Sequence, residues 1–188
     1  MLKMEIDINQ KKIAIGDKYR IFINGQPTYT ASTELFRLFA VVNLFNITGN
    51  RHRLTINKRH AWFKAKYDIR RHDNNVLVFQ TKSFWKKHFQ CRYDSGLYDI
   101  YGHRGRKYSV FKNNEQVAWW DKKKITWFEG DNYKIIADNN SDYELIIAFC
   151  LIIDNYSSND KGKNSMKIDF GNIGPQAKAF DPTWQPSL

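Results

Sequence analysis

Short runs in which apolar and polar residues alternate occupy most of the first 137 positions. In residues 61–69, apolar side chains stand at every second position from Ala61 to Ile69, with charged side chains such as Lys66 between them. This alternation is typical of an antiparallel strand with one face buried and the other in water. The pair Asn24-Gly25, which tolerates positive φ, indicates a tight hairpin turn. The strands predicted in this way cover residues 12–15, 19–23, 28–30, 35–47, 53–56, 61–69, 76–81, 84–93, 97–101, 108–112, 116–120, 125–128 and 133–137. A series of about twelve or thirteen short strands is typical of a sandwich or a barrel.

The alternation ends at residue 138, and a different pattern follows. Ser141 and Glu144 fit an S-x-x-E capping box, in which the Ser hydroxyl accepts from the backbone of Glu144 and the Glu carboxylate reaches back. The nine residues 145–153 are all apolar. A helix that is apolar on every side must be surrounded by protein or lipid, and nine residues rise only about 14 Å, far short of a bilayer core. We therefore expect a helix at residues 141–156, buried inside the protein.

The length of the chain and its last residues suggest one domain followed by a tail. A chain of 188 residues fits a single domain. We assign residues 1–156 to this domain and residues 157–188 to a polar linker and an extended tail that holds three of the four prolines. Residues 166–170 are expected to add a short strand. Trp184 is the residue expected to anchor the tail, either on the body of the domain or on a neighbouring molecule.

Two cysteines and the N-terminal residues bear on the compartment. Cys91 and Cys150 lie far apart, one in a strand-like run and one in the apolar helix, so we expect two buried free thiols. The first 15 residues contain no apolar run long enough for a signal peptide. Both features predict a cytoplasmic protein, with peripheral binding at a membrane as the additional location considered below.

The combination of many short strands with one late, apolar helix resembles the tubby C-terminal-like fold. That fold is shared by the LURP-one-related proteins, the phospholipid scramblases and the tubby domain. The resemblance is strongest over residues 97–154, in Tyr108-Ser109-Val110-Phe111-Lys112 with Gln116-Val117-Ala118, in Asp131-Asn132-Tyr133-Lys134-Ile135, and in the helix from Asp142 to Asp154. It implies a mainly β fold, a closed antiparallel barrel of about twelve strands around one central hydrophobic helix.

The resemblance says less about function than about fold. The LURP-one-related branch implies no settled activity, whereas the tubby branch implies phosphoinositide binding through surface Lys and Arg. The acidic calcium-binding segment of the scramblases has no counterpart in this sequence, so calcium-driven scrambling is not implied. The tail after residue 165 lies outside the resemblance.

Charge is concentrated in the middle of the chain. The net charge is +11, and residues 51–112 hold 16 Lys and Arg against four Asp, so the whole excess lies in this segment. Such an asymmetry suggests an anionic partner. The sequence contains no nucleophile elbow, phosphate loop, dinucleotide fingerprint or paired-histidine metal motif. We therefore expect no enzyme activity, no cofactor and no metal site.

The candidate ligand-binding residues are the basic side chains of this segment. If neighbouring strands align them, they form one cationic surface that binds an anionic membrane lipid or a phosphoinositide. Nucleic-acid binding is the second hypothesis, and a protein-interaction or structural role without a small ligand is the third. An ordinary charged exterior is the alternative to all three. The candidate residues are Arg51, Arg53, Lys64, Lys66, Arg70, Lys86, Arg92, Arg104, Arg106 and Lys107.

Overall fold

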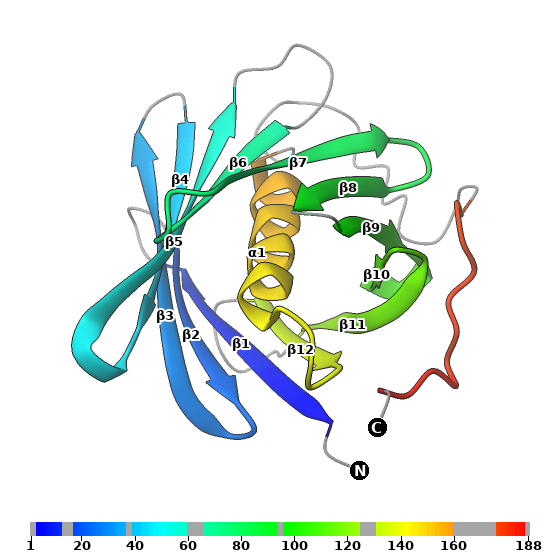
Figure 1. The fold of residues 1–188 in the computed structure, drawn as a ribbon, viewed down its shortest axis with the longest axis horizontal. Coiled ribbons are helices and arrows are strands. Elements are labelled where there is room, and N and C mark those ends of the chain that lie inside the picture. Colours follow the sequence, from blue (N-terminus) through cyan, green and yellow to red (C-terminus); the bar gives the residue numbers. More distant parts are fainter. Residues whose placement is uncertain are drawn as a thin grey trace.

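Twelve antiparallel strands form a closed barrel around one helix in the described part of the computed structural model (Figure 1). The structure describes residues 3–12, 17–36, 39–59, 66–93, 96–124, 131–159 and 176–186. Each strand pairs with its neighbours in sequence, and β1 closes the barrel against β12. The strands are β1 (Met4–Lys12), β2 (Asp17–Ile23), β3 (Gln26–Phe36), β4 (Phe39–Asn46), β5 (Arg51–Arg59), β6 (Lys66–Arg71), β7 (Val76–Ser83), β8 (His88–Tyr93), β9 (Gly96–Gly102), β10 (Lys107–Lys112), β11 (Glu115–Lys124) and β12 (Asp131–Ala137). Two short 3-10 turns, η1 (Thr48–Asn50) and η2 (Arg104–Arg106), and the helix α1 (Tyr143–Asn159) complete the described elements.

The barrel wall follows from the two-residue period of the strands. On β6, Tyr67 and Ile69 are buried and point inward, whereas Lys66 and Arg70 lie on the outer face. The alternation predicted for this strand is thus confirmed over the residues that are described. The hairpin predicted at Asn24-Gly25 is also confirmed, since both residues have positive φ and join β2 to β3.

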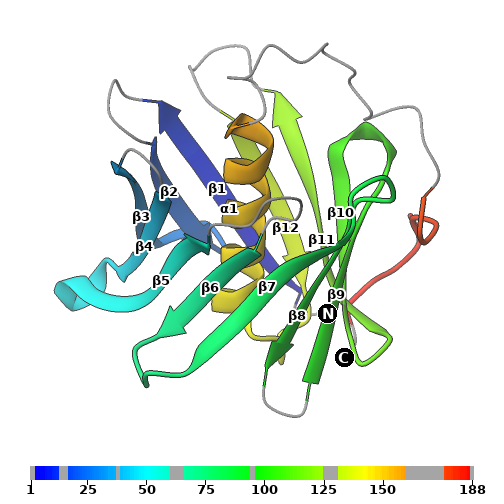
Figure 2. The same cartoon turned by 90° about the horizontal axis from the view of Figure 1, so that it is seen from above.

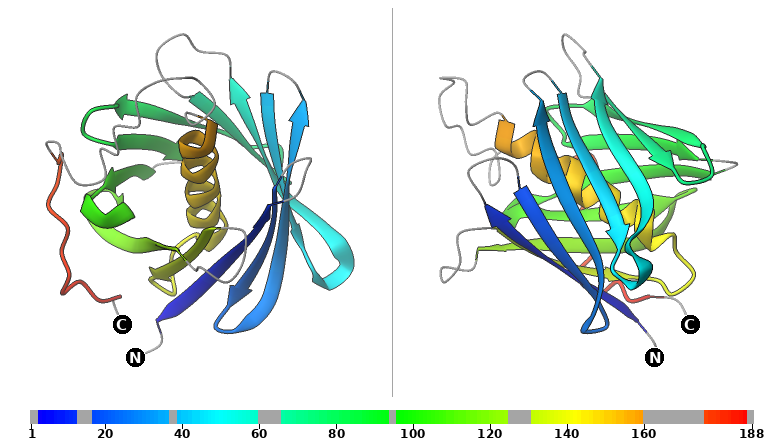
Figure 3. Two further views of the ribbon diagram at one scale, coloured as in Figure 1. Left: turned by 180° about the vertical axis from the view of Figure 1, so that it is seen from behind. Right: turned by 90° about the vertical axis from the view of Figure 1, so that its left-hand side faces the viewer.

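The helix runs through the inside of the barrel, as Figures 2 and 3 show. Each of the nine residues from Leu145 to Ile153 is at most 3% exposed. Phe149, at the centre of α1, packs its ring 5.7 Å from Phe79 on β7 and 5.5 Å from Tyr98 on β9. The predicted buried helix is confirmed, and it fills the space that the twelve strands enclose.

The predicted cap of the helix is wrong in its details. Asp142 is the capping residue, because its Oδ1 accepts from the backbone N–H of Leu145. Ser141 instead donates its hydroxyl to the carbonyl of Asp138. The carboxylate of Glu144 turns away from the helix backbone towards Tyr29 and Arg53. A stronger set of charged and polar partners on the barrel wall therefore replaces the reciprocal capping box.

Most strands extend a few residues beyond their predicted bounds, and three predictions differ from the structure in kind. The run at 35–47 is not one strand, because it is divided between β3 and β4, which pair with Phe36 opposite Phe39. The run at 84–93 begins as a turn, and β8 starts only at His88. The first strand, β1, lies earlier than predicted, since it runs from Met4 to Lys12 with Ile6 and Ile8 facing the core, and residues 13–15 of the predicted strand lie outside the described residues. The strands predicted at 125–128 and 166–170, and residues 61–65 of another, lie outside the described residues.

The described part of the tail, residues 176–186, lies along the outside of β9, β10 and β11 (Figure 1). Phe180 contacts the rings of His103 and Trp119. Trp184, the anchor predicted from the sequence, is half-buried. The tail thus packs on the body of its own chain.

The central position of Phe149 gives a test of the barrel core. Phe149→Ala should lower the free energy of unfolding by about 3–5 kcal/mol, because it leaves a cavity between α1, β7 and β9. Val76→Ala is the control, since Val76 is 48% exposed, and it should change the free energy by less than about 0.5 kcal/mol. Urea unfolding followed by circular dichroism measures both. Equal losses in the two variants would contradict the central packing of the helix.

The two cysteines test burial in a second way. Both are free and buried, as predicted. Burial raises the pKa of the Cys91 thiol to about 12 and also raises the pKa of the Cys150 thiol. Because the thiolate is the reactive form, neither residue should react with Ellman's reagent at pH 8 in the folded chain, and both should react in urea. Rapid labelling of either thiol under native conditions would contradict this placement.

Candidate functional site

A pocket of about 390 Å³ opens at the end of the barrel where α1 begins. Side chains from five strands and the segment before the helix surround it. Three of them are cationic (Arg53, Arg71 and Lys112) and two are acidic (Asp142 and Glu144). The wall between them carries Tyr93, Gly96, Tyr98, Asn140, Ser141 and Tyr143. We call this region the mouth of the barrel.

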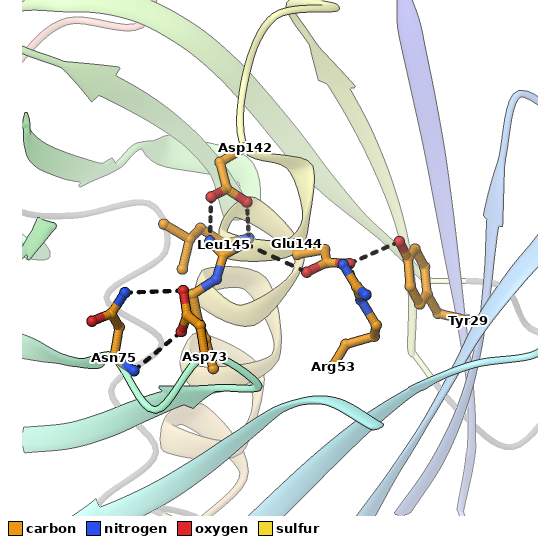
Figure 4. Close-up of polar contacts among 8 residues, drawn as sticks. Tyr29, Arg53, Asp73, Asn75, Asp142, Glu144 and Leu145 are labelled. Carbon is orange, nitrogen blue, oxygen red and sulfur yellow. Dashed lines mark hydrogen bonds and ion pairs between the residues drawn. The ribbon is translucent and has the colours of Figure 1, made fainter. Parts of the chain in front are cut away.

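Glu144 is the centre of a charge network at the mouth (Figure 4). Its Oε1 accepts from the Nε of Arg53 at 2.7 Å and from the hydroxyl of Tyr29 at 3.0 Å. Arg71 pairs with Asp142 and places its Nη2 3.7 Å from Oε2 of Glu144. The hydrogen bond to Glu144 raises the pKa of Arg53, and burial raises the pKa of Tyr29 well above its usual range. Both groups therefore remain protonated and continue to donate to the carboxylate.

Local irregularities place the two arginines at the mouth. The pairing of β4 with β5 shifts by one residue at Arg53, which is the extra residue of a bulge. A bulge redirects a side chain from the regular alternation, and here Arg53 reaches the helix end. Arg71 is the last residue of β6 and follows Tyr67 and Ile69 on the inward face. The alternation of β6 continues to its last residue and places Arg71 on the same face as Tyr67 and Ile69. This pattern in the sequence could have predicted that Arg71 faces inward.

A second acid holds the other end of the helix. Asp154 is buried and accepts from Nζ of Lys122 and from the hydroxyl of Tyr19, each at 3.0 Å, and also from the hydroxyl of Tyr133. The two helix ends are thus fixed to the wall by Glu144 and Asp154. Buried charges persist only where partners and hydrogen bonds surround them, so both networks serve the position of α1.

The candidate residues from the sequence fall into three groups in the structure. Arg51 and Arg53 lie near the mouth, and Arg53 forms an ion pair with Glu144. Lys66, Arg70 and Arg92 lie on the outer wall of β6 and β8. Lys86, Arg104, Arg106 and Lys107 lie in or beside the connections after β7 and β9. Lys64 is outside the described residues. The structure brings only the third group, from two neighbouring connections, into one cluster, so it does not show the single continuous surface that the sequence suggested.

Two connections lie side by side at the end of the barrel opposite the mouth. Residues 84–87 form a turn closed by a hydrogen bond from the backbone N–H of Lys87 to the carbonyl of Phe84. The N–H of Gly102 donates to the carbonyl of Lys87 at 2.9 Å and holds this turn against the start of η2. A Cβ at position 102 would lie 2.7 Å from Cβ of Lys87, so this close approach requires glycine.

The sequence of the barrel and helix matches one family model. The model of the LURP-one-related proteins matches residues 4–154, from β1 into α1. The chain belongs to the LURP-one-related family. No curated protein and no solved structure matches the chain. Within the described part of this LURP-one-related chain, no helix has the length and apolar character to span a bilayer, and no group of His, Cys, Asp and Glu is arranged to hold a metal ion.

Two aromatic side chains project from the turn of this LURP-one-related domain. Trp85 is 72% exposed and Phe84 is 48% exposed. The ring of Phe84 contacts both Trp85 and Tyr156, near the end of α1. Exposed Lys82 and Lys86 flank them in the sequence, and exposed Arg104 and Arg106 lie in η2, in the neighbouring connection. We call these six residues (Lys82, Phe84, Trp85, Lys86, Arg104 and Arg106) the basic–aromatic rim. Sequence reasoning missed its geometry because aromatic residues at 84–85 favoured a strand over a turn.

The charge network at the mouth can be tested by removing Glu144. Glu144→Ala should lower the free energy of unfolding by about 3 kcal/mol, because Arg53 and Tyr29 then lose the buried carboxylate to which they donate, whereas Arg71 keeps Asp142. Asp68→Ala is the matched control, since Asp68 accepts from Nε of Arg59 at the same 2.7 Å but on the outer wall. That change should cost less than about 1 kcal/mol. Thermal and urea unfolding measure both, and an equal effect would contradict a special role for the mouth.

Proposed function

We propose that this LURP-one-related domain is a non-catalytic module that docks on an anionic lipid bilayer through the basic–aromatic rim. One observation carries the proposal, namely the 72% exposure of Trp85 at a turn surrounded by exposed Lys and Arg. Adjacent exposed aromatic rings with polar residues around them mark a surface where a protein or a membrane binds. The partner proposed here is the headgroup region of a membrane.

The aromatic pair suits the boundary between headgroups and acyl chains. Trp is enriched at that boundary, where its ring is apolar and its N–H finds a hydrogen-bond partner. The centroid of the Phe84 ring lies 6.5 Å from that of Tyr156 in α1, and this contact supports the turn on the side of the helix. A supported turn presents Trp85 to the bilayer without the cost of ordering a long loop.

The basic residues of the rim, unlike those of the mouth, are available to pair with an external anion. Lys82, Lys86, Arg104 and Arg106 make no ion pair with any carboxylate of the described residues. Each cation near an anionic surface contributes about 1 kcal/mol, so four of them support reversible docking. Arg53 and Arg71, by contrast, are already paired with acids of α1. This difference favours the rim over the pocket as the ligand-binding surface.

The distribution of charge also favours a membrane over a nucleic acid. The candidate bases of the described residues fall into three separate groups, whereas a phosphate backbone is followed by a continuous track of cations. The rim gathers its bases at one end of the barrel, which suits a flat anionic surface. Anionic lipids enrich the cytoplasmic leaflet, and so the proposal places the domain in the cytoplasm at that surface.

Vesicle co-sedimentation tests the proposal. The full chain should pellet with phosphatidylcholine vesicles that contain phosphatidylserine or a phosphoinositide, and should stay in the supernatant with phosphatidylcholine alone. Removing three charges by Lys86→Ala, Arg104→Ala and Arg106→Ala should weaken binding about a hundredfold. Trp85→Ala should weaken it about tenfold or more, because the ring no longer enters the interface.

The matched control removes three charges elsewhere. Arg51→Ala, Arg70→Ala and Arg92→Ala together change the net charge equally but leave the rim intact, and should weaken binding only a few-fold. Equal pelleting with neutral and anionic vesicles would refute membrane docking. Equal effects of the two triple variants would refute the rim as its site. Tighter binding to a single-stranded oligonucleotide than to anionic vesicles would favour a nucleic acid as the ligand instead.

A further inference from the structure

The outer wall formed by β9, β10 and β11 differs from the rest of the barrel exterior. Outward-facing positions elsewhere carry residues such as Thr30 and Lys66. On this wall the corresponding positions are Tyr101, Phe111 and Trp119, whose strand partners place them on the face away from α1. Outward-facing aromatic rings on three adjacent strands form an apolar patch that a partner can cover. In this structure, the described tail covers it (Figure 1).

Lys178 is the first tail residue that contacts the aromatic rings of the wall. Its Nζ lies 3.5 Å from the centroid of the Phe111 ring and 5.7 Å from that of Tyr101. An ammonium group over the face of an aromatic ring is attracted by the negative potential of that face. The remainder of Lys178 is exposed, and so are Ala177 and Ala179 beside it. The lysine therefore contacts the wall through its cation rather than by burial in a core.

Phe180 is the second tail residue that contacts the aromatic rings of the wall. Its ring lies edge-on to Trp119 with centroids 5.6 Å apart, and 5.2 Å from the ring of His103. Nζ of Lys107 lies 5.0 Å above the Phe180 ring. His103 is fixed beneath it by a 2.7 Å hydrogen bond between its Nε2 and Oγ of Ser109. An aromatic pair on one side and a cation on the other form a site shaped for a single aromatic side chain.

We propose that the wall of β9–β11 is a binding site for linear peptide segments with a cation two residues before an aromatic ring. Lys178-Ala179-Phe180 is its ligand within the same chain. The family match ends at residue 154, so the wall belongs to the shared domain and the tail does not. Lys178 and Phe180 contact the wall while Ala177, Ala179 and Asp181 between and beside them are exposed, which is the alternation of an extended peptide docked through every second side chain.

The tail competes with any free segment for this site because it is part of the same chain. Tethering gives a covalently attached ligand an effective concentration up to the millimolar range. The wild-type chain should therefore hide the site from a free peptide. A variant that has lost its own aromatic anchor should expose the site, with the barrel unchanged.

Fluorescence anisotropy with a labelled peptide of residues 176–186 tests the proposal on full-length protein. The chain carrying Phe180→Ala should bind this peptide in a saturable way, and the wild-type chain should bind it about tenfold or more weakly because its own tail competes. In the peptide, Phe180→Ala should weaken binding roughly tenfold, and Lys178→Ala about two- to fivefold. The exposed Gln185→Ala peptide is the control and should bind like the parent.

Two results would overturn the proposal. One is the absence of saturable binding by the Phe180→Ala chain, with unchanged circular dichroism to show that it is folded. The other is equal binding by the wild-type and Phe180→Ala chains, which would place the peptide on a different surface. A second change, Trp119→Ala in the Phe180→Ala chain, should abolish binding, and retained binding there would exclude this wall. The vesicle experiment measures a different surface, the basic–aromatic rim, so the failure of one proposal leaves the other to be decided by its own experiment.

Discussion

The burial of α1 on every side is the constraint on which the rest of the structure depends. No face of residues 145–153 can meet water, so the strands must enclose the helix completely, and closure of β1 against β12 achieves this. The enclosed helix fills the barrel, so the described residues of its interior form a packed core. Both proposed binding surfaces accordingly lie at the periphery, one at an end of the barrel and one on its outer wall.

The sequence predicted the strands where their two faces differ in polarity and failed where they do not. Tyr67 and Ile69 alternate with charged residues, so the buried face of β6 could be assigned directly. Residues 35–47 are apolar on both faces, and nothing in their pattern marks the reversal between β3 and β4. Phe84 and Trp85 favour a strand by their type, yet they lie in a turn. Intrinsic preference for sheet was overridden there by the position of the turn in the barrel.

The candidate site was less predictable than the fold because it depends on register. A count of charges located the basic segment, but it could not separate available cations from those used to hold the helix. Arg53 was a candidate for ligand binding and instead pairs with Glu144, since a bulge that no sequence pattern reveals turns it towards α1. Arg106, by contrast, is exposed. Its connection lies beside the turn at residues 84–87, which is 15 or more residues earlier in the chain. Such neighbours are set by the closure of the whole sheet.

Membership of the LURP-one-related family fixes the barrel and the helix but does not by itself identify a ligand, because one fold can carry many functions. The distinguishing features lie at its periphery, and Lys107 links two of them. It directly follows Arg106 of the basic–aromatic rim, and its ammonium group lies over the ring of Phe180 in the tail. The attraction of the ring holds this cation in place, so Lys107 marks the point where the outer wall of β9–β11 adjoins the basic–aromatic rim.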